Sequence, residues 1–282
     1  MIVTCGLKCM RQRVTIAALV MFCVFSIRIH AQCNVENYTF KSGEVVTYHA
    51  YYNWHFIWLN AGIVHFSVED KAFGGEDTWF LSAYGRTYSG YDKFMKVRDT
   101  FEVYVDKERF DPIYFNRVTK EGSTVGHHQY WFDYDNRVIK TKVKKNKETV
   151  FRDSVVVLED CTADLLSMVY KARNLDYAKY QVDEKIPIRM IVDNKIFDLF
   201  IRYQGKEIIT NRDGRKFKCL KFSPMLVPGT IFKSGEAMTV WVTDDAARIP
   251  IVVEAKVLVG SVKAVFVDAI GLRNPITAEL FY

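Results

Sequence analysis

An alternation with a period of two dominates this chain and limits the folds available to it. From Val45 to Trp58 the even positions are wholly apolar, whereas the odd positions are mixed. Successive side chains of a β-strand point to opposite faces, so this pattern predicts a long strand with one buried face. A break is expected at Asn60-Ala61-Gly62, after which Ile63 to Glu69 keep the same parity. The interior of a strand therefore explains most of the aromatic stretch from Tyr51 to Gly62.

Similar segments follow along the rest of the chain, separated by turn sequences such as Gly74-Gly75 and Arg212-Asp213-Gly214. Short turns between strands predict an antiparallel meander, and so many strands need closure or stacking to hide their edges. We therefore expect an all-β, mainly antiparallel fold, either barrel-like or made of two joined curved sheets. The further strands expected are 78–86, 100–105, 113–119, 127–133, 138–143, 154–158, 186–192, 196–203, 206–210, 216–222, 237–243, 249–257 and 261–267.

One segment has a helical period instead. Asp160 to Asp164 supply capping side chains, and apolar residues then follow at i, i+3, i+4 and i+7. We expect one amphipathic helix at about 162–174, which plugs an open barrel end or joins two β halves, 38–159 and 177–282. The linker signals that separate domains are missing there, so residues 32–282 are interpreted as a single domain. The predicted apolar stripe is Leu165, Met168, Val169 and Ala172.

The first 31 residues have the form of a cleaved signal peptide. Arg11 and Arg13 precede an uncharged run from Val14 to Ile27, and small Ala31 is the expected last residue of the leader. At about 1.5 Å per residue the run is too short to span a bilayer core of about 30 Å. The chain is therefore expected to be exported to the periplasm or the outer-membrane periphery of a Gram-negative-type cell, and to be soluble after cleavage. Met10 is an alternative start.

Charge argues against a nucleic-acid partner. Residues 1–31 carry four basic residues and no acid, so the formal net charge of +6 falls to +2 without them. The basic run Lys140 to Lys147 is interpreted as a solvated hairpin tip, with an anionic-ligand patch as the alternative.

Three cysteines remain after the leader. One bridge and one buried thiol suit an oxidising compartment, and Cys219 shares a strand face with Phe217, which favours the thiol role. Cys33 and Cys161 are then the candidate disulfide. Lipidation of Cys33 is the alternative, which the large Gln32 before it disfavours.

Several short motifs occur in a fixed order along the chain: Phe40, Gly43-Glu44 and Tyr48; Tyr51 to Trp54; Trp58 to Gly62; Cys161 to Ser167 with Tyr170 and Arg173; Asp213-Gly214; Phe217 to Cys219 with Pro224; and Trp241 to Asp245 with Arg248-Ile249-Pro250. Together they resemble the exported bacterial family known as domain of unknown function 3108. The resemblance implies an all-β, barrel-like envelope protein with no established activity. Trp241 to Pro250 is also similar to periplasmic lipoprotein carriers with a half-open barrel around a helix.

Aromatic residues supply the positive functional signal. A surplus beyond the needs of a sheet interior predicts a concave, partly apolar cavity with a few polar groups. We expect such a cavity to bind a lipid-like or peptide ligand. Its predicted lining is Trp54, Trp58, Trp79, Tyr84, Arg86, Tyr88, Tyr91 and Arg98.

Catalysis has weaker signals. Ser167 lacks a Gly-x-Ser-x-Gly elbow, phosphate-binding glycine loops are missing, and His49, His55, His65, His127 and His128 lack matching ligand spacing, so no cofactor or metal is expected. The hypothesis retained first is a non-enzymatic binding or envelope-assembly protein. A hydrolase of envelope glycan or lipid is the second, and an interaction scaffold with an envelope protein partner is the third. The carboxylates considered for the hydrolase are Glu44, Asp92, Asp99, Glu102 and Asp244.

Overall fold

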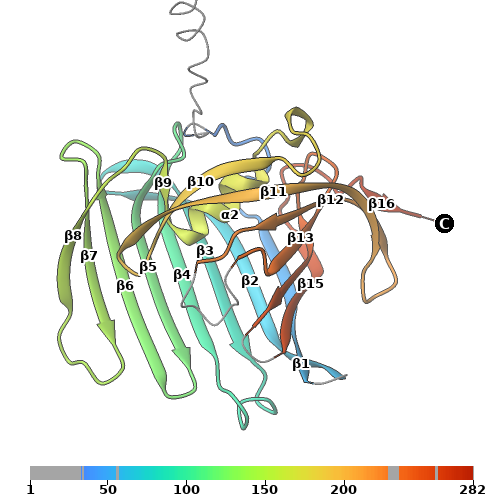
Figure 1. Ribbon diagram of the computed structural model, residues 1–282, viewed down its shortest axis with the longest axis horizontal. Helices are drawn as coiled ribbons and strands as arrows, with labels where there is room; N and C mark the ends of the chain where they lie inside the picture. The colour runs from blue at the N-terminus through green and yellow to red at the C-terminus, as the bar shows by residue number, and fades with distance from the viewer. Residues whose placement is uncertain (1–32, 34, 55–56, 228–234, 258–259, 282) are drawn as a thin grey trace, which may run out of the picture. The chain divides into compact units, whose positions relative to one another are not determined.

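The computed structural model describes residues 33, 35–54, 57–227, 235–257 and 260–281, and the predicted leader lies outside these ranges. Residues Gln32–Tyr282 form one compact unit in which strands predominate (Figure 1). The all-β prediction is therefore confirmed. Within the described ranges no helix is long and apolar enough to cross a membrane.

Fifteen strands follow one another in a single sheet, in the order β8-β7-β6-β5-β4-β3-β2-β1-β15-β14-β13-β12-β11-β10-β9, and β16 pairs with β12 outside this path. The pairing is antiparallel except between β9 and β10. The strands are β1 (Val45–Trp54), β2 (Ile57–Phe73), β3 (Glu76–Thr87), β4 (Arg98–Asp106), β5 (Pro112–Glu121), β6 (Thr124–Asp133), β7 (Val138–Lys145), β8 (Arg152–Val157), β9 (Thr162–Ala163), β10 (Lys185–Val192), β11 (Lys195–Thr210), β12 (Lys216–Pro224), β13 (Met238–Thr243), β14 (Pro250–Lys256), β15 (Ser261–Ile270) and β16 (Glu279–Leu280).

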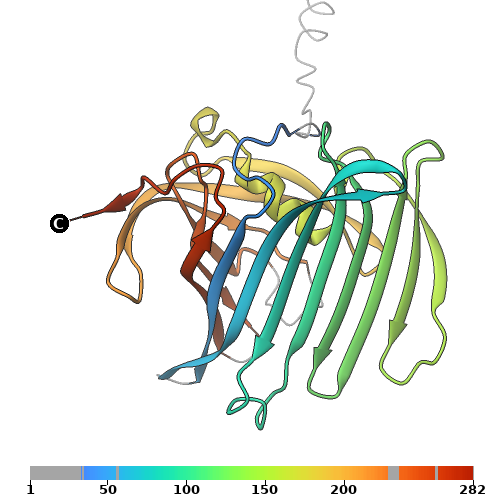
Figure 2. The same cartoon turned by 180° about the vertical axis from the view of Figure 1, so that it is seen from behind.

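The sheet curls around helix α2 (Leu165–Arg173), as the two opposite views in Figures 1 and 2 show. The helix contacts β3 and β4 on one side and β10 on the other. Among the described residues the sheet is not closed by backbone pairing, because β8 and β9 stand at its two ends. Side chains bridge the gap: Asn194 Nδ2 donates to Ser154 Oγ at 3.0 Å, and Arg117 Nη2 donates to Asp193 Oδ1 at 2.6 Å. The architecture is thus one open, barrel-like sheet shared by both halves of the chain.

The long first strand expected from the alternation is in fact two antiparallel strands. β1 ends at Trp54, and β2 begins at Ile57 and runs without interruption through Asn60. The break expected at Asn60-Ala61-Gly62 is wrong, because the pairing register shifts there by one residue instead: Ala50 pairs with Gly62, and Tyr51 pairs with Asn60. Such a bulge keeps the strand continuous while it changes which face each side chain occupies.

Helix α2 is shorter than expected. The backbone of Thr162–Ala163 pairs with β10, so the helix starts at Leu165, with Asp164 as its N-cap. The Asp164 carboxylate accepts from the backbone N–H groups of Leu166 at 2.8 Å and Ser167 at 3.0 Å. This cap satisfies donors that the first turn leaves without partners.

The predicted apolar stripe of this helix is wrong in part. Leu165 and Val169 are exposed, while Leu166, Tyr170 and Arg173 are buried. The buried face contacts strands on two sides, so it includes a charged residue that a hydrophobic pattern does not mark. Leu166 and Tyr170 pack against the inner face of β2 to β7, the largest apolar cluster of the described residues.

The expected disulfide is present between Cys33 and Cys161, which are 128 residues apart in sequence. It ties the N-terminal segment to the start of α2. Cys219 is a buried free thiol, and its burial together with nearby carboxylates raises its pKa to about 12. At that value the thiol stays protonated and unreactive near neutral pH.

Candidate functional site

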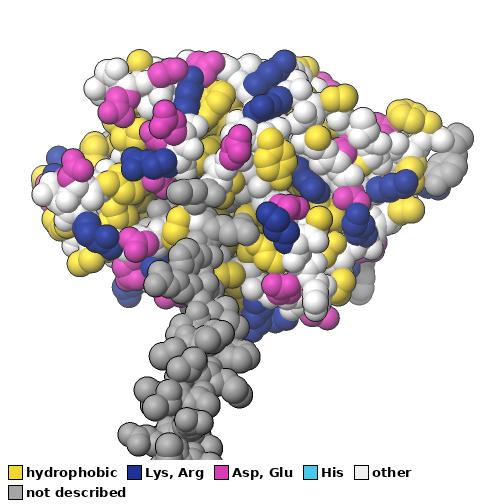
Figure 3. Space-filling model, turned by 90° about the horizontal axis from the view of Figure 1, so that it is seen from above, with side chains coloured by type: hydrophobic (Ala, Val, Ile, Leu, Met, Phe, Trp, Pro, Cys, Tyr) yellow, Lys and Arg dark blue, Asp and Glu magenta, His cyan; other side chains and the backbone are white. Residues whose placement is uncertain are grey.

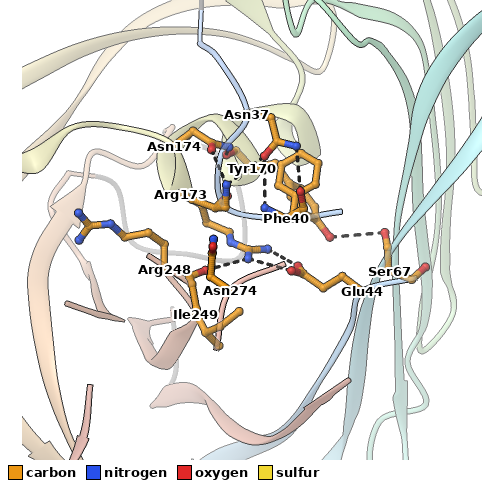
Figure 4. Close-up of polar contacts among 12 residues, drawn as sticks. Asn37, Phe40, Glu44, Ser67, Tyr170, Arg173, Asn174, Arg248, Ile249 and Asn274 are labelled. Carbon is orange, nitrogen blue, oxygen red and sulfur yellow. Dashed lines mark hydrogen bonds and ion pairs between the residues drawn. The ribbon is translucent and has the colours of Figure 1, made fainter. Parts of the chain in front are cut away.

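A buried ionic group joins α2 to the two ends of the chain (Figure 4). Both terminal guanidinium nitrogens of Arg173 donate to the carboxylate of Glu44, at 2.5 and 3.2 Å. Arg173 Nη2 also donates to the carbonyl oxygen of Ala247 at 3.1 Å. The guanidinium lies over the rings of Phe40 and Tyr170. Both charged groups are almost wholly buried, so this group anchors the helix and offers no access to a substrate.

Asparagine side chains extend this anchor. Asn174 Oδ1 accepts from the backbone N–H groups of Tyr38 and Thr39, at 2.9 and 3.2 Å. Asn274 Nδ2 donates to the carbonyl oxygens of Tyr38 and Ala246, at 2.9 and 3.0 Å. The motif residues Phe40, Glu44, Tyr170 and Arg173 therefore meet in space as parts of a structural junction.

The aromatic residues predicted to line one cavity do not share a wall. Trp79 faces α2, with its ring 5.5 Å from that of Phe40. Tyr84 and Arg86 are also in β3, but they are an odd number of positions from Trp79. They therefore lie on the outer face of the sheet and are exposed. Trp58 is half-buried below the amino group of Lys263, 4.5 Å from its ring centroid.

The remaining predicted residues lie in or beside the β3–β4 loop, except for Trp54, whose side chain the structure does not describe. Tyr88 and Tyr91 are half-buried in the segment between β3 and β4. Arg98 donates to both carboxylate oxygens of Asp92, at 3.1 and 2.7 Å, so its charge stabilises that loop. The Trp54 side chain lies outside the described part of the structure.

The carboxylates and nucleophiles considered for catalysis mostly have structural partners. Glu102 accepts from Asn116 at 2.9 Å, and Asp244 pairs with Lys206 at 2.7 Å. Ser167 donates to the capping carboxylate of Asp164. Asp99 differs, because burial raises its pKa to about 6 although the backbone N–H of Lys120 donates to it.

Three of the histidines have polar partners, and the ring of His49 contacts aromatic rings. His127 contacts Asn116 at 2.8 Å, and His65 contacts Thr47 at 3.0 Å. His128 is buried beside Asp193, and burial lowers its pKa. His55 lies outside the described residues. Within the described ranges no group of three or more metal-ligating side chains comes together.

The strongest candidate site lies on the outer face of the sheet. Phe80, Tyr104, Tyr114 and Trp131 come from four successive strands, and the pairing register places each directly beside the next. Their ring centroids are separated by 4.8, 6.3 and 5.0 Å. Phe73, from the end of β2, stacks on Tyr114 at 5.6 Å. We call these five residues the aromatic row.

A row of polar side chains runs beside the aromatic row. The register aligns Ser67, Ser82, Glu102, Asn116 and Gln129 across β2 to β6. Gln129 Nε2 donates to the hydroxyl of Tyr114 at 2.7 Å, so the two rows are linked. Rings beside amide and carboxylate groups form a surface that is able to contact both the apolar and the polar parts of a molecule.

The aromatic row opens into a surface cleft of about 560 Å³ at the end of the sheet that holds the β2–β3, β4–β5 and β6–β7 turns. Acidic, basic and apolar side chains are interspersed over this end, as seen from above (Figure 3). The cleft is lined by Phe73, Glu76, Asp106, Arg109, Asp111, Ile113, Trp131, Phe132, Asp133, Tyr134, Asp135 and Lys140.

Two carboxyl groups of the cleft have opposite pKa shifts. Burial raises the pKa of Asp111, against the opposing charges of Lys171 and Arg109. Hydrogen bonds from Asn136 and then Lys140 lower the pKa of Asp133 to about 2. One carboxyl group therefore accepts a proton more readily than usual, and the other stays ionised.

Comparison with known protein families identifies the family to which the chain belongs. The family model described as "Protein of unknown function (DUF3108)" matches residues 47–267, which is most of the chain. The protein belongs to the DUF3108 family. The motif resemblance noted in the sequence is thus confirmed for this DUF3108 protein. No curated protein matches it in sequence.

A solved structure has a similar fold. It is the crystal structure of a β-barrel-like protein of domain of unknown function DUF1849 from Brucella abortus. The two share 8% sequence identity and a TM-score of 0.52, over 80% of this chain and 96% of that one. This likeness supports the barrel-like architecture of the DUF3108 protein and carries no information on activity.

Proposed function

We propose that the protein is an exported, non-enzymatic binding protein of the bacterial envelope, which holds a partly apolar ligand along the aromatic row and in the adjoining cleft. The observation that carries this proposal is the position of Phe73 and Trp131, which belong to both the row and the cleft lining. The predicted signal peptide and the Cys33–Cys161 disulfide support export to an oxidising compartment.

The polar groups of the cleft narrow the ligand class. Five carboxyl groups line it against two basic side chains, Arg109 and Lys140. Ionised carboxylates only accept hydrogen bonds, so the polar part of the ligand must donate them, as hydroxyl and amine groups do. The excess of acids disfavours an anionic ligand. We therefore propose a lipid-like or peptide ligand with an apolar part and hydroxyl or amine groups.

Native mass spectrometry of protein isolated from the envelope tests this function. We expect a bound small molecule in the wild type and about tenfold lower occupancy in Trp131→Ala, since buried aromatic anchors carry much of the binding energy. Trp241→Ala is the matched control, because both tryptophans are half-buried below a lysine: Lys142 lies 6.0 Å from the ring centroid of Trp131, and Lys221 lies 5.4 Å from that of Trp241. A wild type without any guest, or equal occupancy in both variants, would contradict the proposal.

The opposite pKa shifts of Asp111 and Asp133 favour one alternative, a hydrolase of envelope glycan or lipid. A carboxyl group with a raised pKa and one with a lowered pKa in the same cleft resemble the acid and base pair that glycoside cleavage uses. Under this alternative we expect Asp111→Asn to abolish the formation of product from envelope glycan or lipid. The surface control Asp153→Asn should form product at the wild-type rate. Absence of any product from envelope glycan or lipid incubated with the wild type rejects catalysis.

A further inference from the structure

Exposed apolar side chains gather at the end of the sheet opposite the cleft. Because β1 to β8 are antiparallel neighbours, the end of β1, the start of β2 and the β3–β4, β5–β6 and β7–β8 connections all lie at this end (Figures 1 and 2). Phe94 is 76% exposed and Met95 is 52% exposed in the β3–β4 loop, and Ile57 is 64% exposed at the start of β2. Single exposed apolar residues are ordinary on a surface, whereas several at one end need an explanation.

The β3–β4 loop holds Phe94 and Met95 in a fixed position. The backbone N–H groups of both residues donate to the carbonyl oxygen of Tyr91, at 2.9 and 3.2 Å. The paired Asp92 and Arg98 close the base of the loop, as described above. The two exposed side chains therefore belong to a hydrogen-bonded loop, in which the Phe94 ring also lies 6.0 Å from the ring of Tyr91.

The loop is also tied to the neighbouring connections. The backbone N–H of Tyr88 donates to the carbonyl oxygen of Ala61 in β2 at 3.0 Å. The backbone N–H of Gly122 in the β5–β6 turn donates to the carbonyl oxygen of Lys96 at 2.8 Å. Phe94 and Met95 thus belong to a rim that backbone hydrogen bonds connect to β2 and to the β5–β6 turn.

Basic residues surround these apolar tips. Lys93 and Lys96 flank Phe94-Met95 and are exposed. Residues 92–96, 120–124 and 144–148, which are the three connections or include the strand ends beside them, together contain six lysines and three acids. One of those acids, Asp92, is already neutralised by Arg98. The rim therefore combines large apolar side chains with a local excess of positive charge.

We propose that this end of the protein docks onto a lipid bilayer surface that carries anionic headgroups. Phe94 and Met95 enter the boundary between headgroups and acyl chains, and the lysines contact the headgroups, with their apolar stems along the surface. Apolar insertion combined with electrostatic attraction is the general basis of reversible binding at an interface. The charge pattern distinguishes this partner from a neutral protein surface. The inference is independent of the proposed ligand, because the cleft lies at the other end of the sheet.

Flotation with defined vesicles tests the proposal on the protein as cells process it. Phosphatidylcholine vesicles are compared with vesicles that also contain phosphatidylglycerol. We expect binding to the anionic vesicles only, weakened by added salt, and about tenfold weaker binding in Phe94→Ser/Met95→Ser. Val155→Ser/Val157→Ser is the matched control, since these β8 side chains are 65% and 70% exposed. Any retained leader is present in the wild type and in both double variants, so its contribution to vesicle binding is the same in all three proteins.

A conservative variant gives a second readout. Phe94→Trp keeps a large apolar ring, and its fluorescence should shift to shorter wavelength and be quenched by brominated lipids in anionic vesicles. Equal vesicle binding by the wild type and Phe94→Ser/Met95→Ser, or no quenching of the new tryptophan, would overturn the proposal. Sedimentation of the wild type as a dimer that Phe94→Ser/Met95→Ser dissociates would also overturn it, because a second copy would then cover the rim.

Discussion

Arg173 and Glu44 form a two-point ion pair whose charged groups are almost wholly buried, although the two residues are 129 positions apart in sequence. The pair connects the last turn of α2 to the segment before β1. Removing two charges from water is costly, and here the attraction between them and the added bond to Ala247 offset that cost.

Removal of one member of the ion pair should therefore destabilise the protein more than removal of both. We expect Glu44→Gln to lower the free energy of unfolding by about 3 kcal/mol, because it leaves a buried guanidinium without its counter-charge. The double variant Glu44→Met/Arg173→Met should lose less, since neither charge remains. Urea unfolding at neutral pH measures both. A double variant less stable than Glu44→Gln would refute this account.

Asp99 should make stability depend on pH in an unusual direction. Its folded pKa of about 6 exceeds the unfolded value of 3.8, so the folded state binds more protons between these limits. The free energy of unfolding therefore falls as pH rises from about 4 to about 6. Above pH 6 the ionisation of Asp99 changes it little. Since Asp99 is partly solvated, we expect Asp99→Asn to gain only about 1 kcal/mol at pH 7.5 and nothing at pH 4. Urea midpoints at the two pH values check this, and an equal gain at both would exclude the titration of Asp99 as the cause.

The disulfide should stabilise the fold by restricting the unfolded chain. Cys33→Ser/Cys161→Ser is expected to lower the free energy of unfolding by about 2–4 kcal/mol. A reductant should bring the wild type down to the same value and leave the double variant unchanged. Thermal unfolding with and without reductant provides the measurement. If the reductant also lowered the stability of the double variant, its effect would not come from the Cys33–Cys161 disulfide.

Gly62 should resist substitution because of the backbone beside it. A Cβ at this position would lie 2.3 Å from the carbonyl oxygen of Arg86 and 3.0 Å from Cα of Thr87. We expect Gly62→Ala to destabilise the protein by about 1–3 kcal/mol. Gly85→Ala is the control on the paired strand, where the nearest atom is a Val64 methyl at 3.7 Å. Chemical denaturation of the two variants should separate them, and equal midpoints would contradict the close approach.

Local patterns in the sequence predicted much of the fold, whereas features that depend on pairing were not predictable. Alternation along each strand and the caps near Asp164 act over a few residues, so most strands and the helix were found. The strands expected at 196–203 and 206–210 are one strand, β11, with a register shift between Tyr203 and Lys206 where a turn was expected. The bulge at Ala61 and the row from Phe80 to Trp131 depend on the register between strands, which alternation within one strand does not define. Trp79 and Tyr84 were grouped because they are close in sequence, yet five positions in a strand place them on opposite faces.

The gap between β8 and the β10–β11 turn has a mechanical consequence. In the described residues the bonds that cross it, such as Asn194 to Ser154 and Arg117 to Asp193, involve side chains and no strand ladder. Along this seam the curled wall is therefore held shut by side chains, both by these polar contacts and by Ile191 and Ile196, which pack against the apolar cluster on the inner face of β2 to β7. Its girth can change there without the loss of any strand ladder, but opening also exposes apolar surface to water, and this cost favours the closed form.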